Sequence, residues 1–147
     1  MAEHKNSFME EALAEARAAA ARDEVPVGAV LVHGTSHKIL ARAGNRCIEL
    51  DDPTAHAEML VLREGGAHLT DCDLYVTLEP CPMCAGALSL AHIRRLYFGA
   101  PDPKGGGVEH GPRVFDHPTC HHRPEVFGGL EESQAAVLLK EFFKERR

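Results

Sequence analysis

The chain of 147 residues contains no tryptophan, and aromatic residues make up only 5 % of it. It also lacks any apolar run near the ~20 residues that a membrane-spanning helix requires, so we expect no membrane contact. Positive charge is scarce, because 16 basic residues stand against 22 acidic ones and leave a net charge of −6. This balance excludes a protein whose surface is coated with positive charge. On charge alone it argues against a nucleic-acid-binding protein, and we expect no DNA partner.

The residues that are present suit one folded domain. A length of 147 residues and a mass of 16.0 kDa match a single domain, here residues 1–147, and the 44 % hydrophobic content argues against disorder. The segment from Met1 to Asn6 is polar and leads directly into a helical pattern, so we expect no secretory signal and a cytoplasmic protein.

The cysteine content points to metal binding or catalysis. An odd number of cysteines in a chain without a secretory signal argues against a framework of disulfides. The five cysteines are Cys47, Cys72, Cys81, Cys84 and Cys120. The acidic surplus lies in residues 1–93, and the basic residues of the last segment, 140–147, are typical of a solvated helix face.

Apolar periodicity predicts helices that alternate with strands, which indicates a layered α/β domain. Ser7, with Glu10 as its capping-box partner, predicts the start of the first helix, and Thr54 is a suitable cap for the second. Predicted helices cover residues 7–23, 56–64, 80 or 81 to 91, and 131 or 133 to 147; predicted strands cover 27–33, 38–45, 73–78 and 95–99. Residues 101–123, rich in Pro, Gly and His, indicate a long surface or functional loop.

Two of the predicted helices carry an apolar face that we expect to be buried. In the first helix this face comprises Phe8, Ala12, Leu13, Ala16, Ala19 and Ala20. In the last helix it comprises Ala136, Leu138, Leu139, Phe142 and Phe143.

Two short segments carry the chemistry. His56 and Glu58 stand at the start of one predicted helix, and Cys81 and Cys84 stand one turn apart at the start of another. One imidazole and two thiolates are a donor set that suits zinc, and the free N–H groups of a helix N-terminus favour thiolate over thiol. Three ligands leave a tetrahedral ion one position for a water, which Glu58 can reach as a proton shuttle.

A structural zinc site and a pair of inert buried cysteines are the alternatives to catalysis. A structural zinc needs a fourth ligand, for which Cys120, His121 and His122 are the candidates. Neither alternative has a use for a glutamate beside the histidine, so Glu58 favours the catalytic interpretation.

The two segments match the H-x-E…P-C-x-x-C pattern of zinc deaminases. The chain resembles the cytidine deaminase superfamily and, within it, the bacterial tRNA adenosine deaminases, from about Phe8 through nearly the whole sequence. The zinc motif alone is shared with cytosine, cytidylate and guanine deaminases, whereas the loop after Phe98 and the histidine-rich segment favour tRNA. The segments that carry the resemblance are residues 24–30, 52–58, 74–81, 83–87, 97–100, 102–106, 117–122 and 142–143.

The resemblance implies a three-layer, cytidine deaminase-like α/β fold with a five-stranded mixed sheet flanked by helices. It implies one Zn²⁺ per chain on His56, Cys81 and Cys84, and hydrolytic deamination of the wobble adenosine of a tRNA anticodon to inosine. Zinc-bound hydroxide then attacks C6 of a base flipped out of the anticodon loop, and Glu58 moves the proton to the ring and to the departing ammonia.

The resemblance also implies substrate contacts and a homodimer in which tRNA touches both subunits. Asn45 matches a residue that hydrogen-bonds the target nucleotide; Asp102 and Lys104 match a loop that meets the anticodon stem–loop; His121 and His122 match positions near the flanking bases. Taken alone, each of these residues is an ordinary turn or loop residue.

Two other functions remain open at this point. A deaminase of a free base or nucleotide, such as guanine, cytosine or cytidylate, is supported by the acidic average charge. A non-catalytic binding module stabilised by zinc is the second alternative, and Glu58 speaks against it.

Overall fold

A computed structural model describes residues 2–146, and the side chains of residues 5–146. Five strands form one sheet in the order β2-β1-β3-β4-β5, in which β2, β1 and β3 run antiparallel and β3, β4 and β5 run parallel. The strands are β1 (Gly28–His33), β2 (Ile39–Gly44), β3 (Cys72–Leu78), β4 (Arg95–Ala100) and β5 (Glu125–Phe127). The helices are α1 (Ala2–Ala21), α2 (Ala57–Gly65), α3 (Pro82–Leu90) and α4 (Glu132–Glu145), with the short 3-10 turn η1 (Val114–Asp116).

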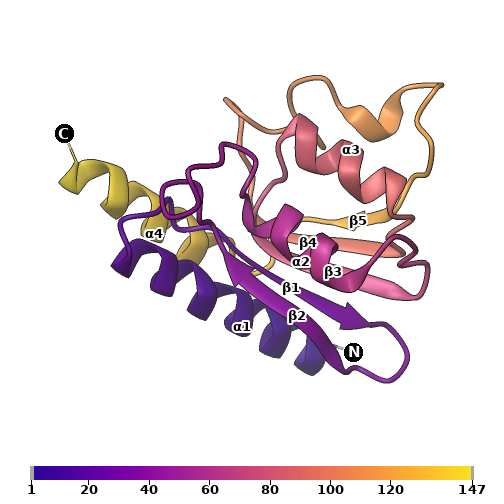
Figure 1. Ribbon diagram of the computed structural model, residues 1–147, viewed down its shortest axis with the longest axis horizontal. Helices are drawn as coiled ribbons and strands as arrows, with labels where there is room; N and C mark the ends of the chain where they lie inside the picture. Colours follow the sequence, from indigo (N-terminus) through magenta and orange to yellow (C-terminus); the bar gives the residue numbers. More distant parts are fainter. Residues whose placement is uncertain (1, 147) are drawn as a thin grey trace.

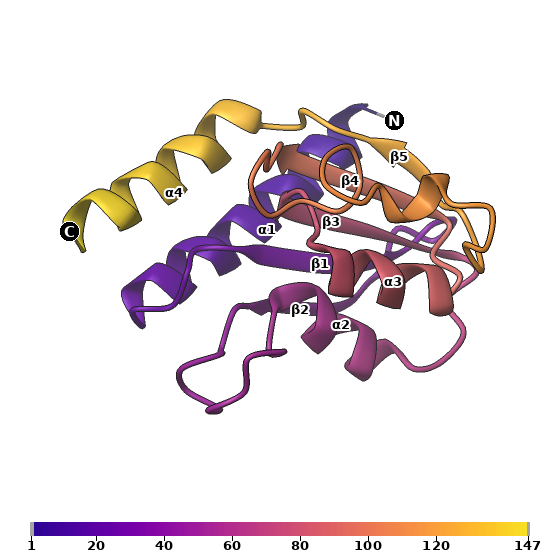
Figure 2. The ribbon, with the colours of Figure 1, turned by 90° about the horizontal axis from the view of Figure 1, so that it is seen from above.

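Helices cover both faces of the sheet and make three layers (Figure 1, Figure 2). On one face, α2 and α3 pack apolar side chains against Leu31 and Leu74. On the other face, α1 packs Leu13 against Val30 and Tyr75, and α4 closes the same layer. Leu31 and Val30 are neighbours in β1 and enter opposite clusters, because side chains alternate along a strand. The predicted three-layer fold with a five-stranded mixed sheet is confirmed.

The predicted helix starts are wrong at two places. α1 begins at Ala2, so Ser7 lies within the helix and does not cap it. In α2 the N-cap residue is His56. Thr54 lies two residues before that position, and its hydroxyl donates to Asp52 Oδ1 at 2.7 Å within the preceding turn.

The faces of α1 and α4 differ in how well periodicity predicted them. All the predicted apolar residues of α1 are buried except Ala20, which is half-buried, and Met9 joins them. In α4, Phe142 is buried and Leu138 and Leu139 are half-buried, but Ala136 and Phe143 are exposed while Ala135 is buried; the predicted Arg147 lies outside the described residues. Ala135 and Phe142 lie two helical turns apart, so both side chains lie on the side of α4 that packs against the protein.

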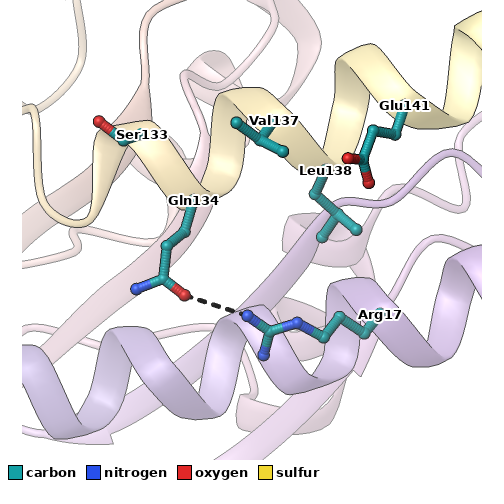
Figure 3. Close-up of a pocket in the computed structure, with 6 residues that line it drawn as sticks. All are labelled: Arg17, Ser133, Gln134, Val137, Leu138 and Glu141. Carbon is teal, nitrogen blue, oxygen red and sulfur yellow. Dashed lines mark hydrogen bonds between the residues drawn. The ribbon is translucent and has the colours of Figure 1, made fainter.

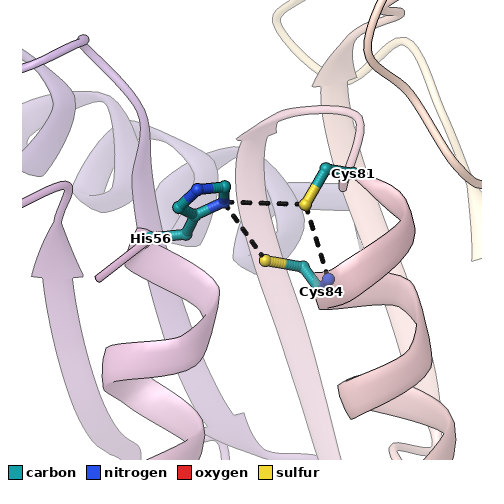
Figure 4. Close-up of side chains that lie close together, drawn as sticks. All are labelled: His56, Cys81 and Cys84. Carbon is teal, nitrogen blue, oxygen red and sulfur yellow. Dashed lines mark hydrogen bonds between the residues drawn. The ribbon is translucent and has the colours of Figure 1, made fainter. Parts of the chain in front are cut away.

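The fold brings the starts of α2 and α3 to one edge of the sheet. α2 follows the loop after β2, and α3 follows the end of β3. Both helices lie on the same face of the sheet and their first turns lie side by side (Figure 4). Across residues 2–146, no helix combines the length and the apolarity that crossing a bilayer requires.

Candidate active site

The three predicted zinc ligands lie together at the starts of α2 and α3. His56 and Cys81 are the N-cap residues of the two helices, and Cys84 lies one turn into α3. His56 Nδ1 lies 3.6 Å from the Cys81 sulfur and 3.5 Å from the Cys84 sulfur (Figure 4). Within the described residues, this is the one group of three possible ligands whose atoms all lie within 4.8 Å of one another.

The spacing of these donor atoms fits zinc. A tetrahedral ion with bonds of ~2.3 Å to sulfur and ~2.0 Å to nitrogen holds a sulfur and a nitrogen about 3.5 Å apart. The observed nitrogen–sulfur distances, 3.5 and 3.6 Å, match this value without movement of a side chain. Three protein ligands of this kind are typical of a catalytic site, which keeps one position for water.

The electrostatics of the site favour sulfur ligands. Hydrogen bonding from the Cys84 thiol, followed by the effect of His56, lowers the pKa of Cys81 to about 4. The Cys84 backbone N–H also donates to the Cys81 sulfur at 3.5 Å, as helix capping requires. The Cys81 thiolate and burial together raise the pKa of Cys84. Since a metal ion deprotonates a coordinating thiol, metal binding at this site releases a proton.

Glu58 lies in the first turn of α2, beside the ligand cluster but outside it. Its side chain is buried, and its Oε1 has no hydrogen-bond partner. Burial raises the pKa of Glu58 to about 7. A buried polar atom without a partner is uncommon in a folded protein and indicates a place for a ligand. A carboxyl group with a pKa near neutrality is suited both to accept a proton and to give it back.

A pocket of about 310 Å³ opens at this cluster, near the lower limit of about 300 Å³ for small-molecule sites. Asn45, His56, Glu58, Cys81 and Asp102 contribute to its lining. It therefore contains both segments of the zinc motif and two of the predicted substrate-binding residues.

Asn45 is oriented by the backbone of α2. Its Oδ1 accepts a hydrogen bond from the Ala57 N–H at 2.8 Å, which satisfies one of the free donors at the helix start. This bond fixes the orientation of the amide and leaves its two N–H donors for a ligand. Asp102 is held differently, since its Oδ1 accepts the backbone N–H groups of Lys104 and Gly105 at 3.2 and 3.0 Å.

The other predicted substrate-binding residues lie outside this pocket. Lys104 is exposed on the loop beyond Asp102. His121 and His122 lie at the far end of α3, where both rings contact His92 and the His122 N–H donates to Ser89 Oγ at 2.8 Å. The zinc cluster lies at the N-terminal end of α3 and these histidines lie at its C-terminal end, and a helix of 9 residues is about 13 Å long.

Cys120 also lies at the far end of α3. Its thiol donates to the His122 carbonyl at 3.2 Å and lies 3.5 Å from Ser89 Oγ. None of Cys120, His121 and His122 joins the zinc cluster, and residues 117–122 form no second group of ligands in the part of the chain that the structure describes. Among the described residues this segment therefore places no fourth ligand at the cluster, which speaks against a structural zinc.

Two buried carboxylates beside the site were missed by the sequence analysis. Glu24 is 2 % exposed and accepts the backbone N–H groups of Ile48 and Glu49. Glu79 is equally buried and binds the loop that carries Asp102. The available signal was position: Glu79 directly follows the apolar strand β3, and Glu24 lies close before β1, and a charge beside a buried strand needs partners.

A second hollow, of about 350 Å³, lies between α1 and α4 on the opposite face of the sheet (Figure 3). Arg17 donates to Gln134 Oε1 at 3.1 Å across it. It is shallow and holds none of the residues of the zinc motif, so size alone does not identify the active site. Its lining comprises Arg17, Ser133, Gln134, Val137, Leu138 and Glu141.

Comparison with known proteins gives a consistent result. Residues 2–100 match the family described as the cytidine and deoxycytidylate deaminase zinc-binding region. The tRNA-specific adenosine deaminase of Agrobacterium fabrum is 58 % identical to this chain, over 97 % of this chain and 96 % of the relative. The enzyme of the same name from Bacillus subtilis is 43 % identical, over 95 % and 89 % of the two chains.

Solved structures are similar as well. One from a study of A-to-I editing by tRNA:A34 deaminases, at the wobble position of transfer RNA, has a TM-score of 0.87 and 59 % identity. It covers 90 % of this chain and 99 % of that one. A guanine deaminase from Nitrosomonas europaea has a TM-score of 0.74 and 26 % identity, over 93 % and 83 % of the two chains.

Proposed function

The chain belongs to the cytidine and deoxycytidylate deaminase family, and on that premise we propose that it deaminates the wobble adenosine of a tRNA anticodon to inosine. The tRNA-specific adenosine deaminases are 58 % and 43 % identical to it nearly end to end, against 26 % for the guanine deaminase. This difference supports an RNA substrate over a free base. We treat residues 1–147 as one deaminase domain.

One observation of the structure carries the catalytic part of the proposal. The unpartnered carboxylate oxygen of Glu58 belongs to the same pocket as the zinc ligands His56 and Cys81. A binding module stabilised by zinc needs no such group, and burying it without a partner lowers stability. The arrangement therefore supports hydrolysis over a purely structural role.

The reaction converts adenosine and water into inosine and ammonia. His56, Cys81 and Cys84 would hold a zinc ion, and the chemistry it would supply is a water whose pKa is lowered to about 7. The Glu58 carboxylate would accept one proton of this water and pass it to the ring nitrogen beside the reacting carbon. It would then accept the second proton, from the hydroxyl now bonded to that carbon, and give it to the amino group, which leaves as ammonia. Asn45 binds an acceptor atom of the nucleotide through its N–H donors.

The same proposal extends to the RNA and to a second subunit. Asp102 and Lys104 lie on the loop beside the pocket and meet the backbone of the anticodon stem–loop. His121 and His122 lie at the opposite end of α3 from the cluster, so we assign them to bases that flank the target, in a homodimer whose RNA touches both subunits. A bacterial tRNA is a cytoplasmic substrate, and we place the protein there.

The test is a comparison of substrates with the zinc-loaded protein. An anticodon stem–loop RNA with adenosine at the wobble position is incubated beside guanine, cytosine and cytidylate, and both inosine and ammonia are measured. A matched RNA, with the adenosine moved into the paired stem, controls for position. We expect inosine only at the wobble position; ammonia from a free base with no inosine in the RNA contradicts the proposal.

A further inference from the structure

Glu79 is a buried charge that neither the zinc cluster nor the proton transfer uses. It stands between the end of β3 and the Pro80-Cys81 segment that starts α3. Its side chain is 0 % exposed. A buried carboxylate is tolerated only where several donors surround it, so its partners define its role.

Among the described residues, the hydrogen bonds to this carboxylate come from one loop, residues 101–110. Asp102 N–H donates to Oε1 at 3.0 Å, and the N–H groups of Val108, Glu109 and His110 donate to Oε2 at 3.1, 2.9 and 3.0 Å. His110 Nδ1 lies 2.8 Å from Oε1. The two ends of the loop are therefore joined through a single side chain that is fixed to the sheet.

The glycines of this loop show how closely it wraps the carboxylate. A side chain at Gly106 would collide with Glu79 Oε2, and its Cβ would lie 2.6 Å from Asp102 O. A Cβ at Gly107 would lie 2.6 Å from Pro82 N, at the start of α3. The Gly107 N–H also donates to Pro80 O at 2.8 Å. The loop is thus fastened to the same turn that presents Cys81.

We propose that Glu79 is a positioning residue for the RNA: its carboxylate clamps loop 101–110 against the start of α3 and so fixes Asp102 and Lys104 at the edge of the pocket. This inference rests on the proposed function for its substrate. Glu79 contributes to the lining of the pocket but is not one of the clustered metal ligands, and both of its carboxylate oxygens are engaged by the loop. Its loss therefore acts on RNA binding rather than on the chemical step.

The variant Glu79→Gln tests the proposal. Glutamine keeps the volume of the side chain but replaces one acceptor oxygen with an NH₂ group. This NH₂ group is a donor that faces the backbone N–H donors or the His110 ring, so the hydrogen bonds at that position are lost. We expect KM for the stem–loop RNA to rise about tenfold, with kcat within about threefold and the zinc content unchanged. A fall in kcat at constant KM, or loss of zinc, overturns the proposal.

Two further variants separate positioning from stability. Asp73→Asn removes a buried carboxylate at the opposite end of β3, where it binds Arg94 at 2.8 and 2.9 Å; it lowers stability but leaves KM unchanged. Gly106→Ala displaces the loop without altering charge and raises KM as Glu79→Gln does. An equal rise in KM in Asp73→Asn, or an unchanged KM in Gly106→Ala, contradicts the role of the clamp.

Hydrogen exchange tests the clamp without any substrate. We expect the amides of Val108, Glu109 and His110 to be protected in the zinc-loaded wild type and to exchange at least about tenfold faster in Glu79→Gln. Unchanged protection overturns the inference even if the enzyme edits RNA. Faster exchange in a protein that forms no inosine supports the clamp and refutes only the proposed substrate.

Discussion

Replacing Glu58 by glutamine separates proton transfer from metal binding. The change preserves the length of the side chain and removes the group that accepts and returns the proton. Glu58 is outside the ligand cluster formed by His56, Cys81 and Cys84, so zinc binding does not depend on it. We therefore expect an inactive protein that still carries one zinc ion per chain.

The expected size of the loss follows from the environment of this carboxyl. Burial raises the pKa of Glu58 to about 7 in the absence of metal, and the positive charge of a bound zinc ion opposes this rise, so near neutrality the carboxylate is available to accept a proton. A general acid–base group poised in this way contributes about 10²- to 10⁴-fold to the rate. Glu58→Gln should lower kcat by that factor, which is about 3 to 5 kcal/mol of activation free energy.

The assay follows inosine formation in the stem–loop RNA under single-turnover conditions, and zinc is quantified in the same preparation by atomic emission. Glu64→Gln is the matched control, because Glu64 is an exposed residue of the same helix. The reasoning is refuted if Glu58→Gln keeps more than about a tenth of the wild-type kcat. Loss of the metal in this variant would instead identify Glu58 as a ligand.

Three other predictions concern the metal, pH and the C-terminal helix. Chelation of the metal should abolish deamination and lower the unfolding temperature measured by scanning fluorimetry, and Zn²⁺ should restore both; a chelated protein with full activity contradicts this. In the metal-free protein, burial raises the pKa of Glu58 from 4.5 to about 7, so wild-type stability falls as the pH rises through this interval. Urea unfolding should show Glu58→Gln more stable than wild type by up to about 3 kcal/mol near pH 8 and equal to it near pH 4, and equal stability at both pH values contradicts the assignment. Lys144→Ala should reduce the slope of RNA affinity against salt concentration by the amount expected for about one phosphate contact. An unchanged slope would mean that Lys144 does not contact RNA and lies on a solvated face of α4. Arg146→Ala should instead lower the free energy of unfolding, because Arg146 donates a hydrogen bond to Asp23 at 2.7 Å and lies over the Phe142 ring.

The zinc ligands were predictable because their signals are local. Cys81 and Cys84 are one helical turn apart, and His56 precedes a helical segment, so each half of the site follows from spacing within a few residues. The strands from β1 to β4 were predicted to within one residue for the same reason: apolar runs identify β1, β3 and β4, and the turn after β1 identifies β2 as its hairpin partner.

Features that depend on distant partners could not be predicted in this way. β5 has only three residues, which is too short for apolar periodicity to predict a strand there. Only the family resemblance implied that the sheet has a fifth strand. Thr54 has the residue type of a helix cap, but its neighbour Asp52 binds its hydroxyl. Glu79 stands at least 23 residues before the amides that bind it, so no local pattern reveals its role.

The most direct test of the central claim is the origin of the oxygen in the product. Wobble-adenosine RNA is incubated with the zinc-loaded protein in water labelled with heavy oxygen, digested to nucleosides and analysed by mass spectrometry. Hydrolytic deamination predicts inosine that carries one labelled oxygen atom, formed only at the wobble position and absent with Glu58→Gln. Unlabelled inosine, or no inosine while guanine is converted, contradicts the account.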